Sequence, residues 1–227
     1  MVPSWGLPTF TPFGLKLIAY MKLAAIPFRV VVEHDPRRGP KGKFPWIVDD
    51  GTVVGDSGFI VRHLIARHGD RLDGWLDPQA RGIAHAHRRM VEESLCFSLL
   101  FFRWTDDETY LRATDVALAG MPVLLRGVAR PLIRRRILRD LWGQGVLRHA
   151  RSEVLELAAS DLDALAVQLG ERPFMLGDRP CSLDATVGAF LAVLLLPPLE
   201  NELKLHAQSL PALVRYCERM RELCFAA

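Results

Sequence analysis

The sequence contains few cysteines, and their positions exclude two kinds of protein. The 227 residues include four, at positions 96, 181, 217 and 224. Their spacing is not that of a metal site, and their density is far below that of a small secreted protein held by disulfides. Cys96, Cys217 and Cys224 fall within apolar helical patterns, which predicts buried packing residues. A reducing intracellular compartment is therefore expected, and the cytoplasm is the predicted location.

A long hydrophobic run is also missing. The longest uncharged run, residues 185–199, is shorter than the about 20 residues that a membrane-spanning helix needs, and it ends at two prolines. The first residues lack the charged segment and long apolar core of a signal peptide. We therefore expect a soluble protein.

The sequence has little excess of charge of either sign. It carries 29 basic and 26 acidic residues, for a net charge of +3. Proteins that bind nucleic acid concentrate positive charge on one face, so no nucleic-acid partner is predicted. His85 and His87 are two positions apart and would project from different sides of a helix, so no metal site is predicted. Half of the chain is hydrophobic, which predicts a substantial core.

The first seventy residues alternate between helical and strand patterns. Thr11 and Pro12 form a helix start, with a capping hydroxyl followed by proline at the first helical position. The apolar pattern predicts a helix to about residue 25. Residues 28–32 are a β-branched run with a single charge, which predicts a buried parallel strand.

A hairpin and a second helix are predicted next. Residues 35–42 read as a loop, and Asp50 and Gly51 form the turn of a hairpin. A helix from residue 57 to about 68 follows. One further strand before Thr11 would complete a β-α-β-β-α unit. Either residues 1–6 supply a very short strand, or the recorded start lies inside it.

Everything after residue 77 has a helical pattern. Polar and glycine residues at 69–77 interrupt the periodicity and indicate a boundary between two parts of the chain. The predicted helices cover residues 78–104, 107–119, 131–142, 152–169, 183–195 and 210–224.

The hairpin and the following helix suggest a ligand. Pro45 cannot donate to a strand ladder, so it belongs at a strand start or edge. If the Phe44–Pro45 bond is cis, the N–H and C=O of Phe44 face outward, free for a ligand. Asp56 and Ser57 stand at a helix N-terminus, which attracts carboxylates. A peptide-like ligand with a free α-carboxylate, such as glutathione, fits this combination.

An ordered set of short motifs extends over nearly the whole chain. They are GLP at 6–8, TPFGLK at 11–16, GKFPWI at 42–47, DS at 56–57, RW at 103–104, GDRPCSLDAT at 177–186 and LPALV at 210–214. Together they resemble the glutathione transferase superfamily, in particular its metaxin-like and failed-axon-connections-like branch, which includes bacterial members. The resemblance implies an α/β plus all-α fold. A thioredoxin-like glutathione-binding domain, residues 1–72, would precede an all-helical C-terminal domain, residues 73–227.

The resemblance also implies how glutathione would lie. Its backbone would pair with Phe44 and Pro45 like an added strand. Asp56 would meet the ammonium of the γ-glutamyl group, and Ser57 its carboxylate. The glycyl carboxylate would meet Lys43 or one of the loop bases Arg37, Arg38 and Lys41. Glutathione would be the co-substrate, with a small electrophile as partner and no metal.

The thiol would then point at Thr11, where many relatives have serine or cysteine. Gly14 stands where those relatives have a second cysteine, so a dithiol redox mechanism is not expected. The Thr11 hydroxyl is predicted either to stabilise the glutathione thiolate or to cap the helix. Both interpretations remain open from the sequence.

The second half supplies candidate pocket residues. Phe13, Arg103 and Trp104 are predicted to line an electrophile pocket, with a structural anchor as the alternative for Arg103 and Trp104. Asp184 lies in a capping box and is interpreted as structural.

Six arginines between positions 126 and 139 lie among apolar residues. We interpret them as a solvated helix face with acidic partners; the alternative is a basic amphipathic surface that contacts membranes. The main hypothesis is thus a glutathione-binding transferase. The alternative is a non-catalytic interaction protein with the same fold, associated with a membrane surface as metaxin-like proteins are. A homodimer is expected from the resemblance.

Overall fold

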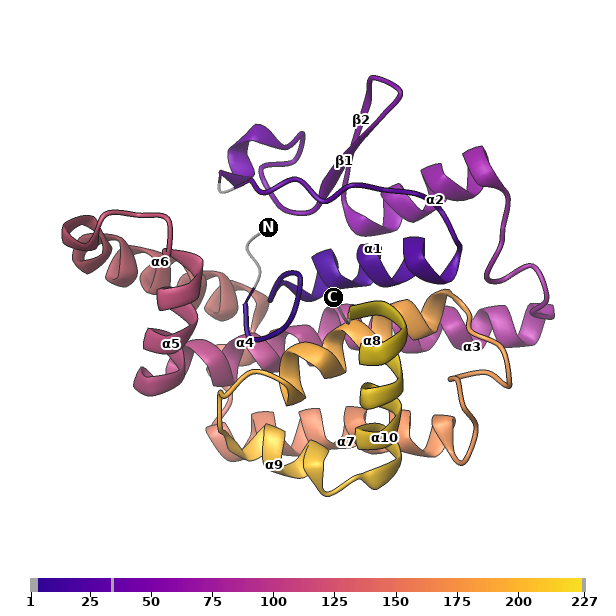
Figure 1. Ribbon diagram of the computed structural model, residues 1–227. Coiled ribbons are helices and arrows are strands. Elements are labelled where there is room, and N and C mark those ends of the chain that lie inside the picture. Colours follow the sequence, from indigo (N-terminus) through magenta and orange to yellow (C-terminus); the bar gives the residue numbers. More distant parts are fainter. Residues whose placement is uncertain (1–3, 34, 226–227) are drawn as a thin grey trace.

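The computed structural model describes residues 4–33 and 35–225. A hairpin and helix α2 (Ser57–His68) lie on one side of α1 (Pro12–Leu23), and most helices of the second half lie on the other (Figure 1). The predicted combination of a small α/β unit followed by helices is confirmed.

Helix α1 joins the two parts of the molecule. It begins as predicted, with Pro12 in its first turn, and it packs along α8 (Ser182–Leu195). Eight of its residues are buried, which explains why its sequence is apolar almost all round. Lys16, in the middle of the helix, is buried as well.

The predicted hairpin is confirmed. Strands β1 (Trp46–Asp49) and β2 (Thr52–Gly55) pair antiparallel, with Trp46 opposite Gly55. Asp50 and Gly51 both have positive φ, 46° and 79°, as the tight turn of a two-residue hairpin requires.

The buried parallel strand predicted for residues 28–32 is wrong. The segment has no strand structure, and Phe28, Val30, Val31 and Val32 are 37%, 41%, 64% and 52% exposed. A parallel strand needs a neighbour to accept its hydrogen bonds. In the described part of the chain the sheet consists of β1 and β2 alone, which pair with each other.

The short strand considered for residues 1–6 lies partly outside the described residues, which begin at Ser4. Ser4 and Leu7 form an isolated bridge with two hydrogen bonds of 2.9 Å, and this is a local turn.

The second half is helical, as predicted. Its elements are α3 (Pro78–Arg89), a π-turn (Met90–Leu95), α4 (Cys96–Thr105), α5 (Asp107–Ala117), α6 (Val123–Gln144), α7 (Arg151–Leu169), α8, α9 (Glu202–Gln208), α10 (Pro211–Met220) and a π-turn (Arg221–Phe225). Short 3₁₀ turns cover Pro36–Arg38 and Val146–Arg148. The start predicted at residue 131 is wrong, because Pro131 lies inside α6. Helix α9 was not predicted.

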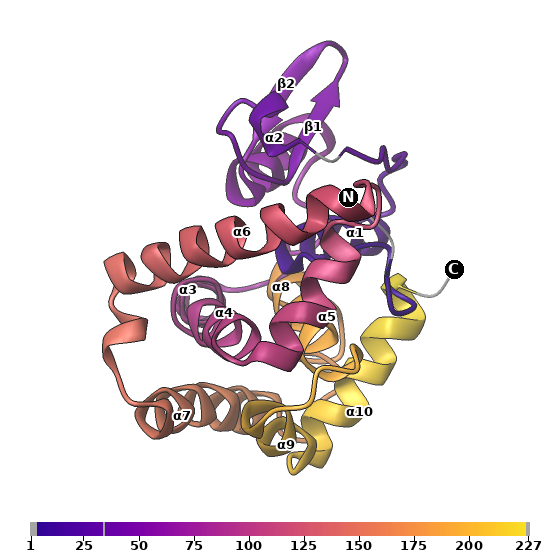
Figure 2. The same cartoon turned by 90° about the vertical axis from the view of Figure 1, so that its left-hand side faces the viewer.

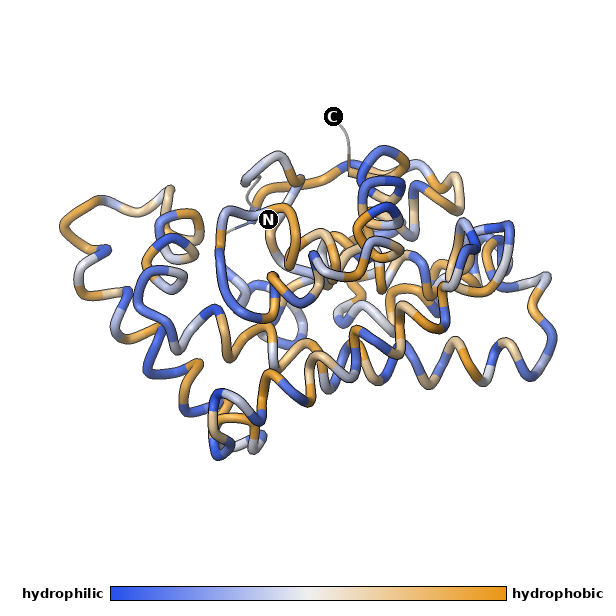
Figure 3. Tube along the Cα trace, turned by 90° about the horizontal axis from the view of Figure 1, so that it is seen from below, coloured by the Kyte–Doolittle hydropathy of each residue, from blue (hydrophilic) through white to orange (hydrophobic). Residues whose placement is uncertain are grey.

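Helix α8 forms the centre of the core and is capped as predicted. The buried carboxylate of Asp184 accepts hydrogen bonds from the N–H groups of Met175 and Cys181, both at 2.8 Å, and from the Tyr216 hydroxyl at 2.9 Å. Asp73, before α3, accepts from the N–H and hydroxyl of Ser182 at the start of α8. Figure 3 shows hydrophobic and hydrophilic positions alternating along the outer helices, as expected for helices with one buried face.

All four cysteines are free and buried. Burial raises the pKa of the Cys96 and Cys217 thiols to about 12 and that of Cys224 to about 11, and it also raises the pKa of Cys181. These thiols are therefore protonated at neutral pH and unsuited to act as nucleophiles. Among the described residues, no helix is long and apolar enough to span a membrane.

Candidate functional site

The Phe44 backbone offers two unused hydrogen-bonding groups. The Phe44–Pro45 peptide bond is cis. Within residues 4–33 and 35–225, neither the N–H nor the C=O of Phe44 has a hydrogen-bond partner. The next residue is anchored, because the Pro45 carbonyl accepts a hydrogen bond of 3.3 Å from the N–H of Asp56. One edge of the hairpin is thus open to an extended chain, directly beside the start of α2.

Two glycines hold the preceding loop against the hairpin. A Cβ atom on Gly39 would lie 2.5 Å from the Trp46 ring, and one on Gly55 would lie 2.7 Å from the Pro40 ring. Both distances are well below van der Waals contact, so only glycine permits this close approach. The contact fixes the loop that leads into Phe44.

Asp56 combines a strained backbone with one unused carboxylate oxygen. Its φ is 80°, uncommon for a residue other than glycine. Its Oδ1 atom caps α2 by accepting from the N–H groups of Gly58 and Phe59, at 2.9 and 3.2 Å. No hydrogen bond is found for Oδ2 in the described part of the chain. The residue is exposed, so this oxygen is available to a ligand ammonium.

Ser57 is connected to a buried ion pair that the sequence did not predict. Its Oγ atom accepts from the Nζ of Lys16 at 3.2 Å. The same Nζ lies 2.5 Å from Oε1 of Glu92, in the π-turn between α3 and α4. Burial lowers the pKa of the Lys16 ammonium, and Glu92 opposes that effect. The partners come from three elements far apart in the sequence, and no local pattern marks them.

Of the four bases considered for the glycyl carboxylate, three have partners. Arg37 pairs with Asp35 at 2.9 Å, and Arg38 pairs with Glu33 at 3.0 Å. The Lys41 ammonium lies 4.0 Å from the centre of the Phe59 ring. The exposed Lys43 makes no such contact with any described residue, which favours it for the role.

Thr11 lies at the start of α1, but its side chain does not cap the helix. In the described part of the chain, no N–H of the first turn donates to its hydroxyl. Its Oγ1 instead lies 3.2 Å from Oγ1 of the buried Thr9, which also accepts from the Thr11 N–H at 3.3 Å. Sequence reasoning did not single out Thr9. A signal was present, because Thr9 and Thr11 both carry hydroxyl groups just before Pro12, which begins the helix.

The three predicted pocket residues separate into two groups. The Phe13 ring packs edge-on against Phe190, with ring centres 5.5 Å apart. The Arg103 guanidinium donates to the Val193 carbonyl at 3.3 Å and lies 5.5 Å from the centre of the Phe10 ring. Positions 190 and 193 are neighbours on one face of α8.

Trp104 faces elsewhere. It is buried against Tyr110, with ring centres 6.0 Å apart, at the corner between α4 and α5. This favours the anchor interpretation for Trp104. Arg103 is buried as well, and burial lowers its pKa to about 10.

Lys16 connects the two ends of the candidate site. It lies on α1 five residues after Thr11, which corresponds to about 7.5 Å along the helix axis. Its ammonium donates to Ser57 at the start of α2. Figure 1 shows the hairpin and α2 on the same side of α1.

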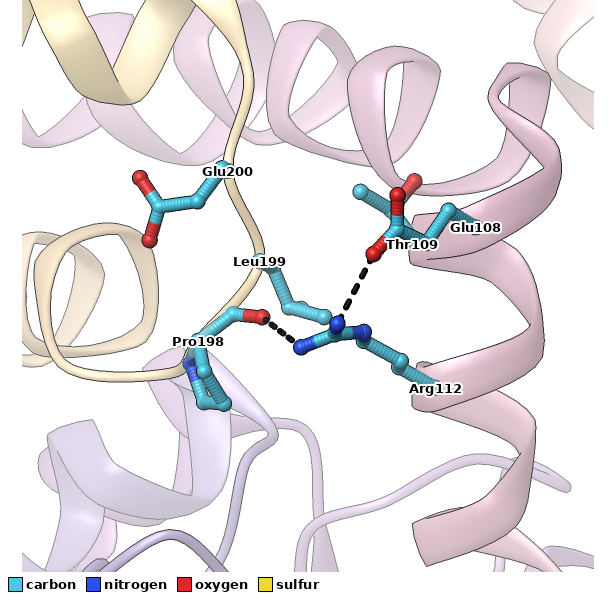
Figure 4. A pocket seen from close by; sticks show the side chains of 6 residues that line it. All are labelled: Glu108, Thr109, Arg112, Pro198, Leu199 and Glu200. Atoms are coloured by element: carbon cyan, nitrogen blue, oxygen red, sulfur yellow. Dashed lines mark hydrogen bonds and ion pairs between the residues drawn. The ribbon is translucent and has the colours of Figure 1, made fainter.

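A hollow elsewhere on the surface is too small for such a ligand. It has a volume of about 50 Å³ and lies between α5 and the loop that follows α8. Arg112 crosses it and donates to the Pro198 carbonyl at 3.1 Å and to Glu108 at 2.8 Å (Figure 4). The described residues contain no cluster of side chains suited to a metal ion.

Comparisons with known proteins identify the class. Two family profiles match the chain: "Glutathione S-transferase N-terminal domain" over residues 12–114 and "Glutathione S-transferase, C-terminal domain" over residues 158–220. The chain belongs to the glutathione S-transferase family.

The alignments with three curated relatives cover most of this chain. It is 35% identical to an isoprene-epoxide–glutathione S-transferase of a Rhodococcus species, over 97% of this chain and 95% of that protein. It is 28% identical to mouse metaxin-1, over 98% of this chain and 73% of that protein. It is 26% identical to Drosophila melanogaster failed axon connections, over 96% of this chain but 55% of that protein.

Solved structures of glutathione transferases share the fold. A transferase from Methylobacterium radiotolerans, in complex with glutathione sulfonate, matches with a TM-score of 0.58 at 21% identity, over 94% of this chain and 87% of that one. A glutathione transferase from Phanerochaete chrysosporium matches with a TM-score of 0.66 at 15% identity, over 98% and 94%. The predicted glutathione transferase fold is therefore confirmed, and so is the resemblance to the metaxin-like branch.

Proposed function

We propose that the protein binds glutathione and transfers its thiol to a small electrophile. The observation that carries the proposal is the open Phe44 backbone beside the start of α2. A peptide bound there would gain two backbone hydrogen bonds. Its γ-glutamyl ammonium would meet Asp56 and its γ-glutamyl carboxylate would meet Ser57, with Lys43 near the glycyl carboxylate.

The protein would contribute orientation and an activated thiol. The free thiol, with a pKa of about 8.5, is mostly protonated at neutral pH. A hydroxyl donor and the N-terminus of α1 would favour the thiolate, which is the reactive form. We propose Thr11, at the start of α1, as the residue that supplies this hydroxyl.

We infer that the electrophile is a small epoxide, on the basis of the Rhodococcus relative named for isoprene epoxide. The glutathione sulfur would attack one ring carbon and form a C–S bond. The C–O bond at that carbon would break, and the resulting alkoxide would take a proton from water. The product is a hydroxy thioether, and no oxidant or metal is needed.

The test is a conjugation assay with isoprene monoxide and glutathione, followed by mass spectrometry. We expect the hydroxy thioether to form faster with the protein than with the protein carrying Asp56→Asn and Ser57→Ala together. Equal rates with native and altered protein would overturn the proposed transferase function.

A second candidate function is contact with an anionic membrane surface, and the outer face of α6 favours it. The apolar residues Leu124, Val128 and Leu132 are 92%, 64% and 61% exposed and recur every four positions. The exposed arginines that continue this face are Arg135, Arg136 and Arg139. Such an apolar stripe with adjoining arginines complements an anionic lipid surface.

The other three arginines of α6 have internal partners, as the solvated-face interpretation expected. Arg126 donates to the carbonyls of Ala119 and Met121, and Arg130 pairs with Asp115. Arg134 pairs with Asp107. Helix α6 packs against α4 and α5, at the edge of the helical half. Figure 2 shows α6 running along the outside of that half.

Vesicle co-sedimentation tests the membrane candidate. Binding should require phosphatidylserine in the vesicles and should be lost when Arg135 and Arg136 are both changed to glutamate. In the matched control, the exposed Arg215 and Arg221 at the C-terminal end of the chain are both changed to glutamate. This control variant should bind the vesicles normally. Equal binding by both double variants would exclude α6 as the lipid-binding face.

We further propose that the protein acts in the cytoplasm as a homodimer. The four free buried thiols support a reducing location. Light scattering after gel filtration would give the mass of the particle, and a mass near that of one chain would overturn the dimer.

A further inference from the structure

A buried lysine and glutamate lie behind the proposed glutathione site. The side chains of Lys16 and Glu92 are 4% and 12% exposed, and their charged atoms are 2.5 Å apart. Burying two charges is costly, and replacing such a pair by apolar residues is often neutral or stabilising. A contribution to stability is therefore a weak explanation for the pair.

The hydrogen-bond polarity of this cluster points to a ligand. An ammonium can only donate, so the Ser57 Oγ accepts from Lys16 at 3.2 Å. The hydrogen of the Ser57 hydroxyl is then left for another acceptor. In the described part of the chain no group accepts it, and the N–H of Ser57 also has no partner. Two donors thus converge at the start of α2, with a buried positive charge behind them.

We propose that Lys16 is a positioning residue for the γ-glutamyl carboxylate of glutathione. Its ammonium, held by Glu92, fixes the Ser57 hydroxyl as a donor to that carboxylate and adds a favourable charge behind it. This inference rests on the proposed function. The inference adds two residues to the proposed glutathione site, Lys16 and Glu92, which do not touch the ligand and act through Ser57.

The pair also connects the carboxylate site to the second half of the chain. Lys16 lies on α1, Ser57 begins α2, and Glu92 lies in the π-turn between α3 and α4. Short π-helical segments within α-helices, such as this one, frequently occur at functional sites. Here the π-turn contributes the carboxylate that holds the ammonium in place.

The test compares two ligands in a thermodynamic cycle, measured by calorimetry. One is S-methylglutathione, which reports binding without chemistry. The other is the same compound with its γ-glutamyl carboxylate converted to a primary amide. The native protein should prefer the carboxylate by about thirtyfold, since hydrogen bonds to charged groups are strong. In Lys16→Met the preference should fall to about threefold.

Lys204→Met is the matched control. Lys204 is also buried, on α9, where it donates to the Pro197 carbonyl and Glu200. This variant should keep the native preference. A preference retained in Lys16→Met, or lost equally in both variants, would overturn the role of Lys16. If the native protein binds neither ligand, the proposed function itself fails.

A measurement on the native protein does not depend on how a variant folds. In nitrogen NMR of labelled lysine, S-methylglutathione should shift the Lys16 ammonium signal, and the amide ligand should shift it by less than half as much. Equal shifts with both bound ligands would overturn the inference. Lys16→Gln, which keeps an N–H donor without the charge, replaces Lys16→Met if the latter does not fold.

Discussion

At the residue scale, the proposed site consists of polar atoms that their own neighbours do not use. The Phe44 N–H and C=O and the Asp56 Oδ2 have no hydrogen-bond partner among the described residues. Their neighbouring atoms are firmly held, since the Pro45 carbonyl and the Asp56 Oδ1 are both bonded. The unused atoms are therefore fixed in position before a ligand arrives, which lowers the entropic cost of binding.

Removing the Thr11 hydroxyl should raise the pKa of the bound thiol. A hydrogen bond to a charged acceptor contributes about 1.5–3 kcal/mol, so Thr11→Val should raise that pKa by about 1–2 units. With glutathione saturating, the pH profile of kcat/KM for the electrophile reports the bound thiol and would move upward by the same amount. Thr11→Ser keeps the hydroxyl and should retain the native profile. Coincident profiles for Thr11→Val and the native protein would refute a catalytic role for Thr11.

Asp56→Asn should separate folding from binding. The asparagine oxygen can still cap α2, and asparagine tolerates positive φ, so the free energy of unfolding should change by less than about 0.5 kcal/mol. The ligand ammonium loses its charged partner, so glutathione should bind about tenfold more weakly. Urea unfolding and calorimetry measure the two quantities. Unchanged affinity would remove Asp56 from the site.

Short motifs in the sequence indicated some residues of the proposed site, and the sequence did not indicate those that only the fold brings together. Phe44, Pro45, Asp56 and Ser57 follow from a proline before a strand and a helix start. Lys16 and Glu92 are separated by 76 positions, and each alone looks like an ordinary helical residue.

At the element scale, helices and the hairpin were predictable because their hydrogen bonds are local. The hairpin needs only its own turn, and each helix needs only its own cap and periodicity. The run at residues 28–32 was assigned to a strand by composition alone, but a strand also needs a partner from elsewhere in the chain. Helix α6 was placed too late because a proline was read as a start.

The hairpin should depend on pH through Asp49. The Nε2 of His63, on α2, lies 2.7 Å from Oδ2 of Asp49, and this hydrogen bond lowers the pKa of the Asp49 carboxyl below its ordinary 3.8. A lowered folded pKa means that the stabilisation is complete above pH 3.8 and is lost as the pH falls through the folded value. The difference in Tm between native protein and Asp49→Asn should therefore shrink as the pH falls below 3.8. A difference that grows as the pH falls below 3.8 would contradict this account.

Helix α6 provides a matched pair of arginines. Arg134 donates to the carbonyls of Trp104 and Thr105, at 3.0 and 2.8 Å, whereas the adjacent Arg135 is exposed. Arg134→Ala should lower the free energy of unfolding by about 1–3 kcal/mol because it leaves carbonyl groups without donors. Arg135→Ala should change it by less than about 0.5 kcal/mol. Equal effects in urea unfolding would show that α6 is not held by these bonds.

At the scale of the whole molecule, the two halves meet along α1. It packs along α8, and Lys16 extends from it to Glu92 of the second half. The family assignment fits this arrangement, since matches to both family profiles lie in the expected order. Relatives in this family include a named transferase and metaxin-1, so the fold alone does not decide the activity.

The most direct test of the central claim is a calorimetric titration of the native protein with glutathione at two temperatures. Two temperatures are needed because the binding enthalpy changes with temperature and can be zero at one of them. We predict a saturable signal with one glutathione per chain and a Kd of about 1 mM or lower. No heat at either temperature with about 10 mM glutathione would contradict a glutathione site at Phe44.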